Sequence, residues 1–229
     1  DNMKAKVHSQ YENANEMQIV DLPKPTIKKD TILIKMKAVN IASGDMRINT
    51  LSAPKPLKLI MRLIFGWKGP RKKIRGISGA GLVVETGDKV ANFKKGDKVY
   101  FINSMGAGAL AEYIALNEKS IISHLPKNMS FEEAAPLAFG AMSAIHFINE
   151  KNIHENDDVL IYGASGSVGT YALQLAKYYG GKVTAICSKK NHQVVQSIGA
   201  DHVIDYKTTD ISLLKTKYDV ILDAVSKIK

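Results

Sequence analysis

The sequence has little cysteine and tryptophan and no long hydrophobic run. Its 229 residues include one Cys and one Trp. The single thiol, Cys187, cannot form an intramolecular disulfide or a Cys-rich zinc site, and it fits a reducing compartment. No segment reaches the ~20 apolar residues that a spanning helix requires, and residues 1–7 lack the apolar core of a signal peptide. These absences predict a cytoplasmic protein without a membrane span.

Acidic residues are absent from a long internal segment. Between Met46 and Val84 there is no Asp or Glu, although the whole chain has 22 acids against 32 Lys and Arg, a formal net charge of +10. A field of that sign attracts anionic partners such as a phosphorylated cofactor, nucleic acid or an acidic membrane surface. The simplest interpretation is a solvated basic face. The cations of the segment are Arg47, Lys55, Lys58, Arg62, Lys68, Arg71, Lys72, Lys73 and Arg75.

The first half of the chain has the pattern of β structure. Short apolar or alternating runs separated by Gly-containing turns predict a small barrel or sandwich. These runs are residues 32–39, 79–85, 98–102 and 111–116. In the first run, a period of two places one set of side chains on a common face. The expected members of that face are Ile32, Ile34, Met36 and Ala38.

The second half alternates strands with helices. Ser130 and Glu133 have the spacing of a capping box, at the start of a helix expected to run through Ile148. Alternation of short apolar strands with helical patterns indicates βαβ units and a parallel sheet. The expected strands are residues 158–162, 182–187, 202–206 and 219–225. Because Pro126 interrupts regular structure, we predict two domains, 1–124 and 125–229.

A glycine-rich segment carries the clearest functional signal. Gly163, Gly166 and Gly169 follow a predicted strand directly and precede a predicted helix. One glycine permits a sharp turn, one lets the backbone approach a pyrophosphate, and one lets the helix pack on the strand. The helix N-terminus then offers free N–H groups to phosphates. In this context the pattern predicts a dinucleotide site. Its expected cofactor-binding residues are Gly163, Ser165, Gly166, Ser167, Val168 and Gly169.

The end of the next predicted strand favours NADPH over NADH. An NAD site places Asp or Glu about 20 residues beyond the glycines, on the ribose hydroxyls. Here the strand ends at Cys187 and continues as Ser188, Lys189 and Lys190, without an acid. Ser188 and Lys189 would donate hydrogen bonds to a 2′-phosphate and neutralise it. The alternative is that the two lysines only cover the start of the next helix.

Further segments along the whole chain carry a family resemblance. They are residues 40–45, 95–99, 108–113, 134–136, 198–206 and 218–223, together with the glycine turn. With these segments the chain resembles the medium-chain dehydrogenase/reductase superfamily, in its zinc-free, quinone-oxidoreductase-like branch. The resemblance implies a GroES-like β-barrel domain on the substrate side, followed by a Rossmann domain with a doubly wound parallel sheet.

The resemblance also implies roles for particular residues. Asn40 would lie near the nicotinamide and the substrate carbonyl, and Ser143 would bind the nicotinamide end. Tyr206 would stack beside the adenosine, and residues 223–225 would lie under the nicotinamide ribose. The structural alternatives are that Asn40 only ends a strand, Ser143 only packs in a helix, and Tyr206 only lies at the surface. The expected ribose contacts are Asp223, Ala224 and Val225.

The zinc ligands of the superfamily are missing. Zinc-dependent members carry a Cys near the position of Ser43 and a Gly-His-Glu before the next Gly-x-Gly. This chain has Arg75-Gly-Ile-Ser-Gly-Ala-Gly81 there, so the His and the Glu are absent. Zinc catalysis needs three protein ligands, and the six His residues show no ligand spacing. We therefore predict no zinc.

The resemblance implies an NADPH-dependent enzyme that transfers hydride to a quinone or an α,β-unsaturated carbonyl compound. The chemistry belongs to the cofactor, with Asn40 as a candidate donor to the developing oxyanion and water as the proton source. One alternative is an NAD(P)-dependent alcohol or aldehyde oxidoreductase. An alternative of another class is a basic module for nucleic acid or an anionic surface, although no aromatic-rich platform for bases is present. A homodimer is an expectation from the family.

Part of the acid-free segment has a helical period. Leu57, Ile60, Met61, Ile64 and Phe65 recur at helical spacing, with basic residues on another side. Such a helix can lie on a membrane surface or pack over a substrate cleft. Given the family resemblance, we expect a lid or a packed surface helix.

On the plan of the family, the chain ends early. Residues 225–229 follow the fourth expected strand of the nucleotide sheet, whereas a Rossmann sheet has six. The family's chain also returns to complete the barrel domain. We therefore expect a C-terminally truncated chain with an incomplete Rossmann domain, an exposed sheet edge and little activity on its own.

Overall fold

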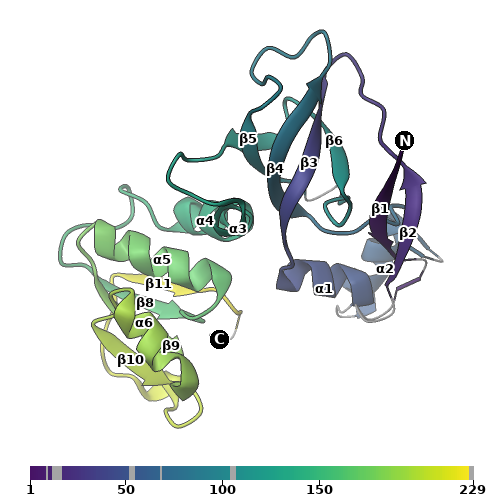
Figure 1. The fold of residues 1–229 in the computed structure, drawn as a ribbon. Helices are drawn as coiled ribbons and strands as arrows, with labels where there is room; N and C mark the ends of the chain where they lie inside the picture. The colour runs from purple at the N-terminus through teal and green to yellow at the C-terminus, as the bar shows by residue number, and fades with distance from the viewer. Residues whose placement is uncertain (9, 12–16, 52–54, 68, 104–106, 227–229) are drawn as a thin grey trace. The chain divides into compact units, whose positions relative to one another are not determined.

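The computed structural model describes residues 1–8, 10–11, 17–51, 55–67, 69–103 and 107–226. The chain divides into unit 1, Asp1–Ala138, and unit 2, Phe139–Lys229. The two units differ in kind, as the change of sequence period predicts: strands dominate unit 1, and strands alternate with helices in unit 2 (Figure 1).

Unit 1 contains an antiparallel five-stranded sheet with the order β6-β3-β4-β5-β7. Its strands are β3 (Thr31–Asn40), β4 (Ser78–Thr86), β5 (Lys98–Ile102), β6 (Tyr113–Asn117) and β7 (Ile121–His124). The four strands predicted for this unit are confirmed. Strand β7 was not predicted from the sequence. A separate hairpin was also not predicted, and it pairs β1 (Asn2–Val7) with β2 (Gln18–Pro23). Two helices, α1 (Ser43–Thr50) and α2 (Lys55–Phe65), connect β3 to β4.

Between Met36 and Ala38, strand β3 has one residue more than the part of β4 that it pairs with. Met36 lies opposite Gly81, and Ala38 lies opposite Ala80, so Lys37 has no partner of its own on β4. An extra residue of this kind is a β-bulge, which twists the strand and changes the direction of the side chains that follow.

The bulge exchanges the faces of the residues at the end of β3. Val39 packs with the core around Phe101, together with the residues that precede the bulge. Ala38 instead packs with the smaller cluster around Ala80. The expected common face is therefore wrong at Ala38, because one extra residue shifts a period-two pattern by one position. The side chains that share the face of Val39 are Ile32, Ile34 and Met36.

Pro136 divides the helix that was expected to begin at Ser130. The first piece is α3 (Phe131–Ala134), and the second is α4 (Leu137–Phe147). The capping box is confirmed, because the Ser130 hydroxyl accepts from the Glu133 amide at 3.2 Å and the Glu133 carboxylate accepts from the Ser130 amide at 2.8 Å. A proline lacks the amide donor of a helix interior and clashes with the preceding turn, so the helix stops and starts again.

Helix α3 belongs to unit 1. Ala134 and Ala135 are buried against Ala80 of strand β4. The division between the units consequently falls after Ala138, whereas the sequence placed it after residue 124.

Unit 2 has a parallel four-stranded sheet with the order β10-β9-β8-β11. Strand pairing confirms the predicted βαβ units. The chain passes from β8 to β9 and β10 on one side, then crosses to β11 on the other side of β8. This reversal is the topological switch point at which open α/β sheets bind ligands. The elements are β8 (Asp158–Tyr162), α5 (Ser167–Tyr178), β9 (Lys182–Cys187), the short 3₁₀ helix η2 (Lys189–Asn191), α6 (His192–Ser197), β10 (His202–Asp205), η3 (Ile211–Leu213) and β11 (Val220–Asp223).

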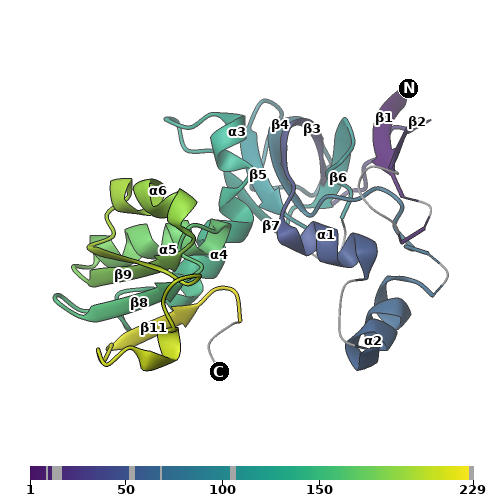
Figure 2. The ribbon, with the colours of Figure 1, turned by 90° about the horizontal axis from the view of Figure 1, so that it is seen from below.

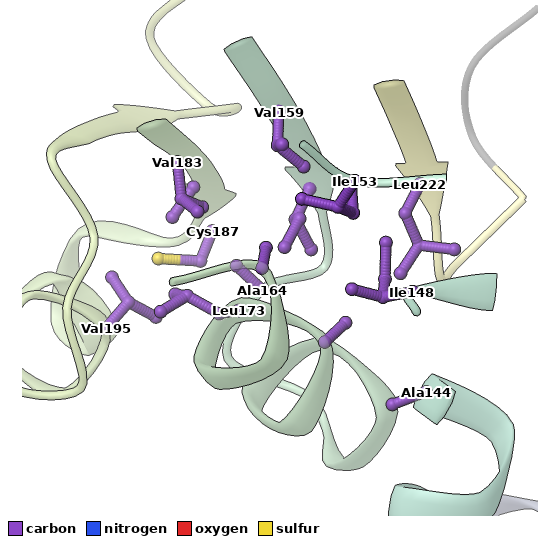
Figure 3. Packing of buried hydrophobic residues seen from close by; sticks show 14 residues of the cluster. Ala144, Ile148, Ile153, Val159, Ala164, Leu173, Val183, Cys187, Val195 and Leu222 are labelled. Atoms are coloured by element: carbon purple, nitrogen blue, oxygen red, sulfur yellow. The ribbon is translucent and has the colours of Figure 1, made fainter. Parts of the chain in front are cut away.

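The core of unit 2 lies between this sheet and its helices. Figure 3 shows Val159, Val183 and Leu222 on the strands facing Leu173 of α5 and Ala144 of α4. All are buried, and full burial of a Val or Leu side chain contributes about 1.5–3 kcal/mol. This packing fixes the carboxyl ends of β8 and β9 and the start of α5.

Candidate dinucleotide-binding site

The glycine turn joins the carboxyl end of β8 to the start of α5. Gly163 has a φ of +80°, a backbone conformation that favours glycine. Its amide donates to the Ile186 carbonyl of β9 at 2.9 Å, so the turn is docked onto the neighbouring strand. A Cβ at Gly163 would lie 2.7 Å from Cγ1 of Val225. The first glycine therefore permits both a sharp turn and the close approach of the Val225 side chain to the backbone of the turn.

The other two glycines have different surroundings. A Cβ at Gly169 would lie 2.7 Å from the Ala164 Cα and closer still to the Gly163 carbonyl oxygen, so helix and turn are in direct backbone contact. A Cβ at Gly166 would meet only the Gly163 oxygen, at 3.2 Å. Gly166 thus borders open space, where a phosphate group can come close to the backbone. These are the three separate needs that the glycine spacing predicted.

Helix α5 begins at this turn. Gly166 is its N-cap residue and offers no side-chain acceptor to the first turn of the helix. Gly166 and Ser167 are exposed. Unpaired N–H groups and the positive end of the helix dipole therefore face outward, which is the arrangement that binds phosphate.

Three polar side chains meet beside the turn, at the carboxyl end of β9. The Asn191 amide nitrogen donates to the Ser165 hydroxyl at 2.8 Å and lies 3.4 Å from the Ser188 hydroxyl. Asn191 thereby links the glycine turn to the end of the second strand. The sequence pattern predicted both serines as site residues but not Asn191. The signal for Asn191 was a polar residue that ends a Ser-Lys-Lys-Asn run directly after a buried strand.

Lys189 and Lys190 lie next to this group and are exposed. None of the salt bridges in the described part of the chain involves either of them. The neighbouring strand β10 does end in a carboxylate, Asp205, opposite Cys187. Burial and the charge of Asp205 raise the pKa of the Cys187 thiol. The Asp205 carboxylate accepts from the Lys207 amide at 3.0 Å, while β9 itself continues into Ser188.

Other predicted residues lie at the same edge of the sheet. Tyr206 follows β10, is exposed, and has its ring centroid 6.1 Å from that of Tyr162. Asp223 ends β11 and accepts from the Val225 amide at 3.0 Å, and the Ala224 amide donates to the Tyr162 carbonyl at 3.0 Å. Together with the contact of Val225 at Gly163, these bonds gather the expected nucleotide-site residues of unit 2 at the carboxyl ends of its strands.

Ser143 has a bond within its own helix. Its hydroxyl donates to the Phe139 carbonyl at 2.8 Å, which is a common arrangement for Ser in a helix interior. The two lone pairs of the hydroxyl oxygen can still accept a hydrogen bond. Helix α4 lies against α5, because a Cβ at Gly140 would be 2.7 Å from the Tyr171 ring.

Asn40 is the predicted substrate-side residue of unit 1. It ends β3 opposite Ser78, and its amide nitrogen donates to the Ser78 hydroxyl at 3.3 Å. Ser78 is fully buried, so it holds the amide from below the surface. Ser78 was not predicted as a partner of Asn40, because the two residues are 38 positions apart.

A buried charged group holds helix α1 in the same unit. Arg75 is 5% exposed, and its Nε donates to Asn49 of α1 at 2.7 Å. Burial raises the pKa of Asp45 above its usual value, opposed by hydrogen bonds from the backbone of Ala42 and Ile77 and by the charge of Arg75. Burial likewise lowers the pKa of Arg75.

No metal site is visible in the part of the chain that the structure describes: no three His, Cys, Asp or Glu side chains come together as ligands. Of the residues discussed for zinc, the side chain of Ser43 lies outside the described part. The absence of zinc stays a prediction.

The fold and the glycine turn together define the class of protein: a GroES-like β domain joined to a Rossmann-like domain. Two family models match the chain, the alcohol dehydrogenase GroES-like domain at residues 28–127 and the zinc-binding dehydrogenase model at residues 167–229. The structure of the quinone oxidoreductase from Coxiella burnetii is 31% identical, with a TM-score of 0.86, and the match covers 98% of this chain and 69% of that one.

Curated relatives indicate the same class of protein. The chain is 37% identical over 221 residues to the chloroplastic quinone-oxidoreductase QR1 of Triphysaria versicolor, covering 90% of this chain and 63% of that protein. It is 33% identical over 235 residues to the chloroplastic NADPH-dependent alkenal/one oxidoreductase of Arabidopsis thaliana, covering 97% and 57%. The chain belongs to the medium-chain dehydrogenase/reductase superfamily, in its quinone-oxidoreductase-like branch, which confirms the resemblance. It spans about three fifths of the length of these two relatives.

Proposed function

We propose that this protein is an NADPH-dependent oxidoreductase that reduces quinones or α,β-unsaturated carbonyl compounds. The observation that carries the proposal is the end of strand β9, where Ser188, Asn191 and Lys189 replace the carboxylate of an NAD site. The printed names of two relatives, a quinone oxidoreductase and an NADPH-dependent alkenal/one oxidoreductase, support the substrate class. In this proposal unit 1 serves the substrate side and unit 2 binds the cofactor.

The residues of unit 2 fit a dinucleotide. The open side of Gly166 and the start of α5 would receive the pyrophosphate. Ser188 and Lys189 would hold the 2′-phosphate through charge-assisted hydrogen bonds, and Tyr206 would lie beside the adenosine. Residues 223–225 and Ser143 would contact the nicotinamide half.

A bound nicotinamide cofactor supplies hydride transfer. The residues of the chain have the simpler tasks of binding, orienting and stabilising charge. An Asn side-chain amide carries two N–H donors. One N–H of Asn40 is held by Ser78, and the other can donate to a substrate oxygen on which negative charge develops. The proton for that oxygen would come from water.

Cofactor preference is the direct test. NADPH and NADH are titrated against the chain by nicotinamide fluorescence, and we expect NADPH to bind more tightly. Lys189→Gln removes a charge-assisted contact, typically about 1.5–3 kcal/mol, so it weakens NADPH roughly 10- to 100-fold and leaves NADH unchanged. Lys182→Gln is the matched control, because Lys182 is exposed at the opposite end of the same strand. Tighter binding of NADH by the folded chain would contradict the proposal.

The substrate class is tested by NADPH oxidation with a quinone, an alkenal and an aldehyde. We expect turnover of the quinone or the alkenal. Turnover of the aldehyde alone would favour the alcohol or aldehyde oxidoreductase instead. No helix of the described chain is long and apolar enough to cross a membrane. Cytoplasmic location, the absence of zinc and nucleic acid, and a homodimer remain proposals, and the two named relatives are chloroplastic proteins.

A further inference from the structure

Helix α2 presents an apolar face whose side chains are about half exposed. At 3.6 residues per turn, five apolar positions occupy about 160° of its circumference. These residues, the apolar face, are Leu57 (48% exposed), Leu59 (52%), Ile60 (51%), Leu63 (60%) and Ile64 (48%). The half-buried side of the helix holds Met61, Arg62 and Phe65. The arrangement is the reverse of an ordinary surface helix, which turns its apolar stripe toward the core.

The sequence predicted a lid or a packed surface helix. A packed helix would bury the apolar face, which the structure leaves about half exposed. In Figure 2, α2 lies away from the five-stranded sheet of its own unit. An exposed apolar patch of this kind is uncommon in a protein without a partner for it and marks an interaction site.

The loop that follows α2 is tied back to the helix end. The Arg71 amide donates to the Phe65 carbonyl at 2.7 Å, and the Arg62 guanidinium donates to the Trp67 carbonyl at 3.2 Å. The Tyr11 hydroxyl donates to the Gly66 carbonyl at 2.7 Å. These bonds fix the backbone while the Trp67 side chain stays 55% exposed. Trp is the side chain that favours the boundary between water and lipid.

Positive charge lies close to the apolar face in the sequence. Arg71, Lys72 and Lys73 in the loop after the helix are exposed, and Lys58 is exposed on the side of the helix opposite the apolar face. The side chains of Arg47 and Lys55, and all of Lys68, lie outside the described residues. Because the segment 46–84 contains no acid, nothing within it offsets these charges. A partner for this surface must accept apolar side chains and supply negative charge.

We propose that α2 with Gly66, Trp67 and residues 69–73, together the α2 surface, binds an anionic phospholipid membrane. The helix would lie in the plane of the membrane, with its apolar face and Trp67 among the upper acyl chains and the cations of the following loop at the headgroups. Eleven residues span only about 16 Å as a helix, so the helix lies on the bilayer and does not cross it. The proposal is independent of the cofactor and the substrate.

Two other occupants fit the surface less well. A second copy of the chain would bring two surfaces of the same sign together, which is unfavourable. Nucleic acid would match the charge, but it would leave five aliphatic side chains in water and meet one exposed aromatic ring. Both alternatives are outcomes of the experiment below.

Trp67 reports on binding directly, because it is the only Trp of the chain. The protein is mixed with vesicles of phosphatidylcholine alone, or of an equimolar mixture of phosphatidylcholine and phosphatidylserine. We expect a blue shift of Trp67 emission and flotation with the anionic vesicles only, both weakened by high salt. Brominated acyl chains should quench the emission.

Two sets of variants separate the apolar and charged contributions. Leu59→Glu with Leu63→Glu should abolish flotation. Val194→Glu with Leu213→Glu adds the same charge at exposed apolar positions of unit 2 and should change vesicle affinity far less. Replacing the three loop cations together with Gln should lower the affinity for anionic vesicles on the order of 100-fold, because each cation near an anionic surface contributes about fivefold to that affinity. The loop cations are Arg71, Lys72 and Lys73.

Several results would overturn the proposal. They are no flotation of the folded chain at low salt, equal binding to neutral and anionic vesicles, or unchanged binding after the α2 substitutions. Self-association or nucleic-acid binding through this surface without vesicle binding would do the same. None of these results affects the NADPH titration, so the two proposals fail separately.

Discussion

The three glycines of the turn make a prediction that separates cofactor binding from folding. Gly166→Ala adds a methyl group that meets only one oxygen, at 3.2 Å, and the φ of −82° suits alanine. Alanine is a weaker N-cap than glycine, which destabilises the folded chain by up to about 1 kcal/mol. Alanine also lowers the conformational entropy of the unfolded chain, which stabilises the folded chain by about 0.4–1 kcal/mol. The free energy of unfolding should therefore change little.

Cofactor affinity should change much more. The new methyl group occupies the open side of the turn and keeps a phosphate oxygen from the backbone N–H groups of α5. Loss of one hydrogen bond to a charged group costs about 1.5–3 kcal/mol, so the dissociation constant for NADPH should rise roughly 10- to 100-fold. The assay is fluorescence titration of NADPH alongside thermal unfolding of the same samples.

Gly169→Ala is the contrasting variant. Its methyl group would lie 2.7 Å from the Ala164 Cα, and backbone on both sides must move to admit it. Such overpacking costs about 1–3 kcal/mol, which lowers the unfolding midpoint by roughly 2–12 °C. Binding of NADPH by the Gly166 variant with wild-type affinity would refute the assignment of the open side to the phosphates. An unchanged midpoint for the Gly169 variant would refute the packing argument.

Three further predictions concern single side chains. Asn191→Asp places a carboxylate beside the predicted 2′-phosphate, so NADPH should bind roughly 10- to 100-fold more weakly while NADH changes little; parallel fluorescence titrations measure both, and an equal loss for the two cofactors would count against the site. Arg75→Gln removes the charged donor to Asn49 and should destabilise the chain by about 1.5–3 kcal/mol in urea unfolding; a loss near the ~0.5 kcal/mol of a surface substitution would show that this hydrogen bond is not needed. Hydrogen bonds from Ser130 hold the pKa of Glu133 below 4.5, so this carboxylate stabilises the fold above pH 4.5 and loses that effect as the pH falls through the lowered pKa. Glu133→Gln should therefore flatten the acid limb of the stability curve, and a limb identical to that of the wild type would contradict the prediction.

The sequence predicts most of unit 2 because its signals are local. The glycine spacing, the apolar strands and Gly180, which has a φ of +88° just beyond α5, each act within a few residues. The role of Asn191 was not predicted, because its partner Ser165 lies 26 positions away in the sequence. No periodicity in the sequence reveals a contact over that separation.

Unit 1 is harder to predict for physical reasons. The hairpin β1–β2 has no sharp turn signal, and its strands are half exposed. The helical pattern that begins at Ser130 continues past Pro136, so the pattern alone does not show the break that the proline causes. The apolar period of α2 is real, but a period does not show whether the apolar side faces the protein or the solvent.

The bulge at Lys37 has a consequence for the chemistry at the end of β3. Had the alternation of Ile32, Ile34 and Met36 continued unchanged, position 40 would point into the apolar core. A carboxamide buried there without partners would cost about 1–3 kcal/mol. The one extra residue directs the Asn40 amide away from the apolar core and toward the Ser78 hydroxyl. A strand that packs in the core along most of its length can thus end in a polar side chain that is available to bind a substrate.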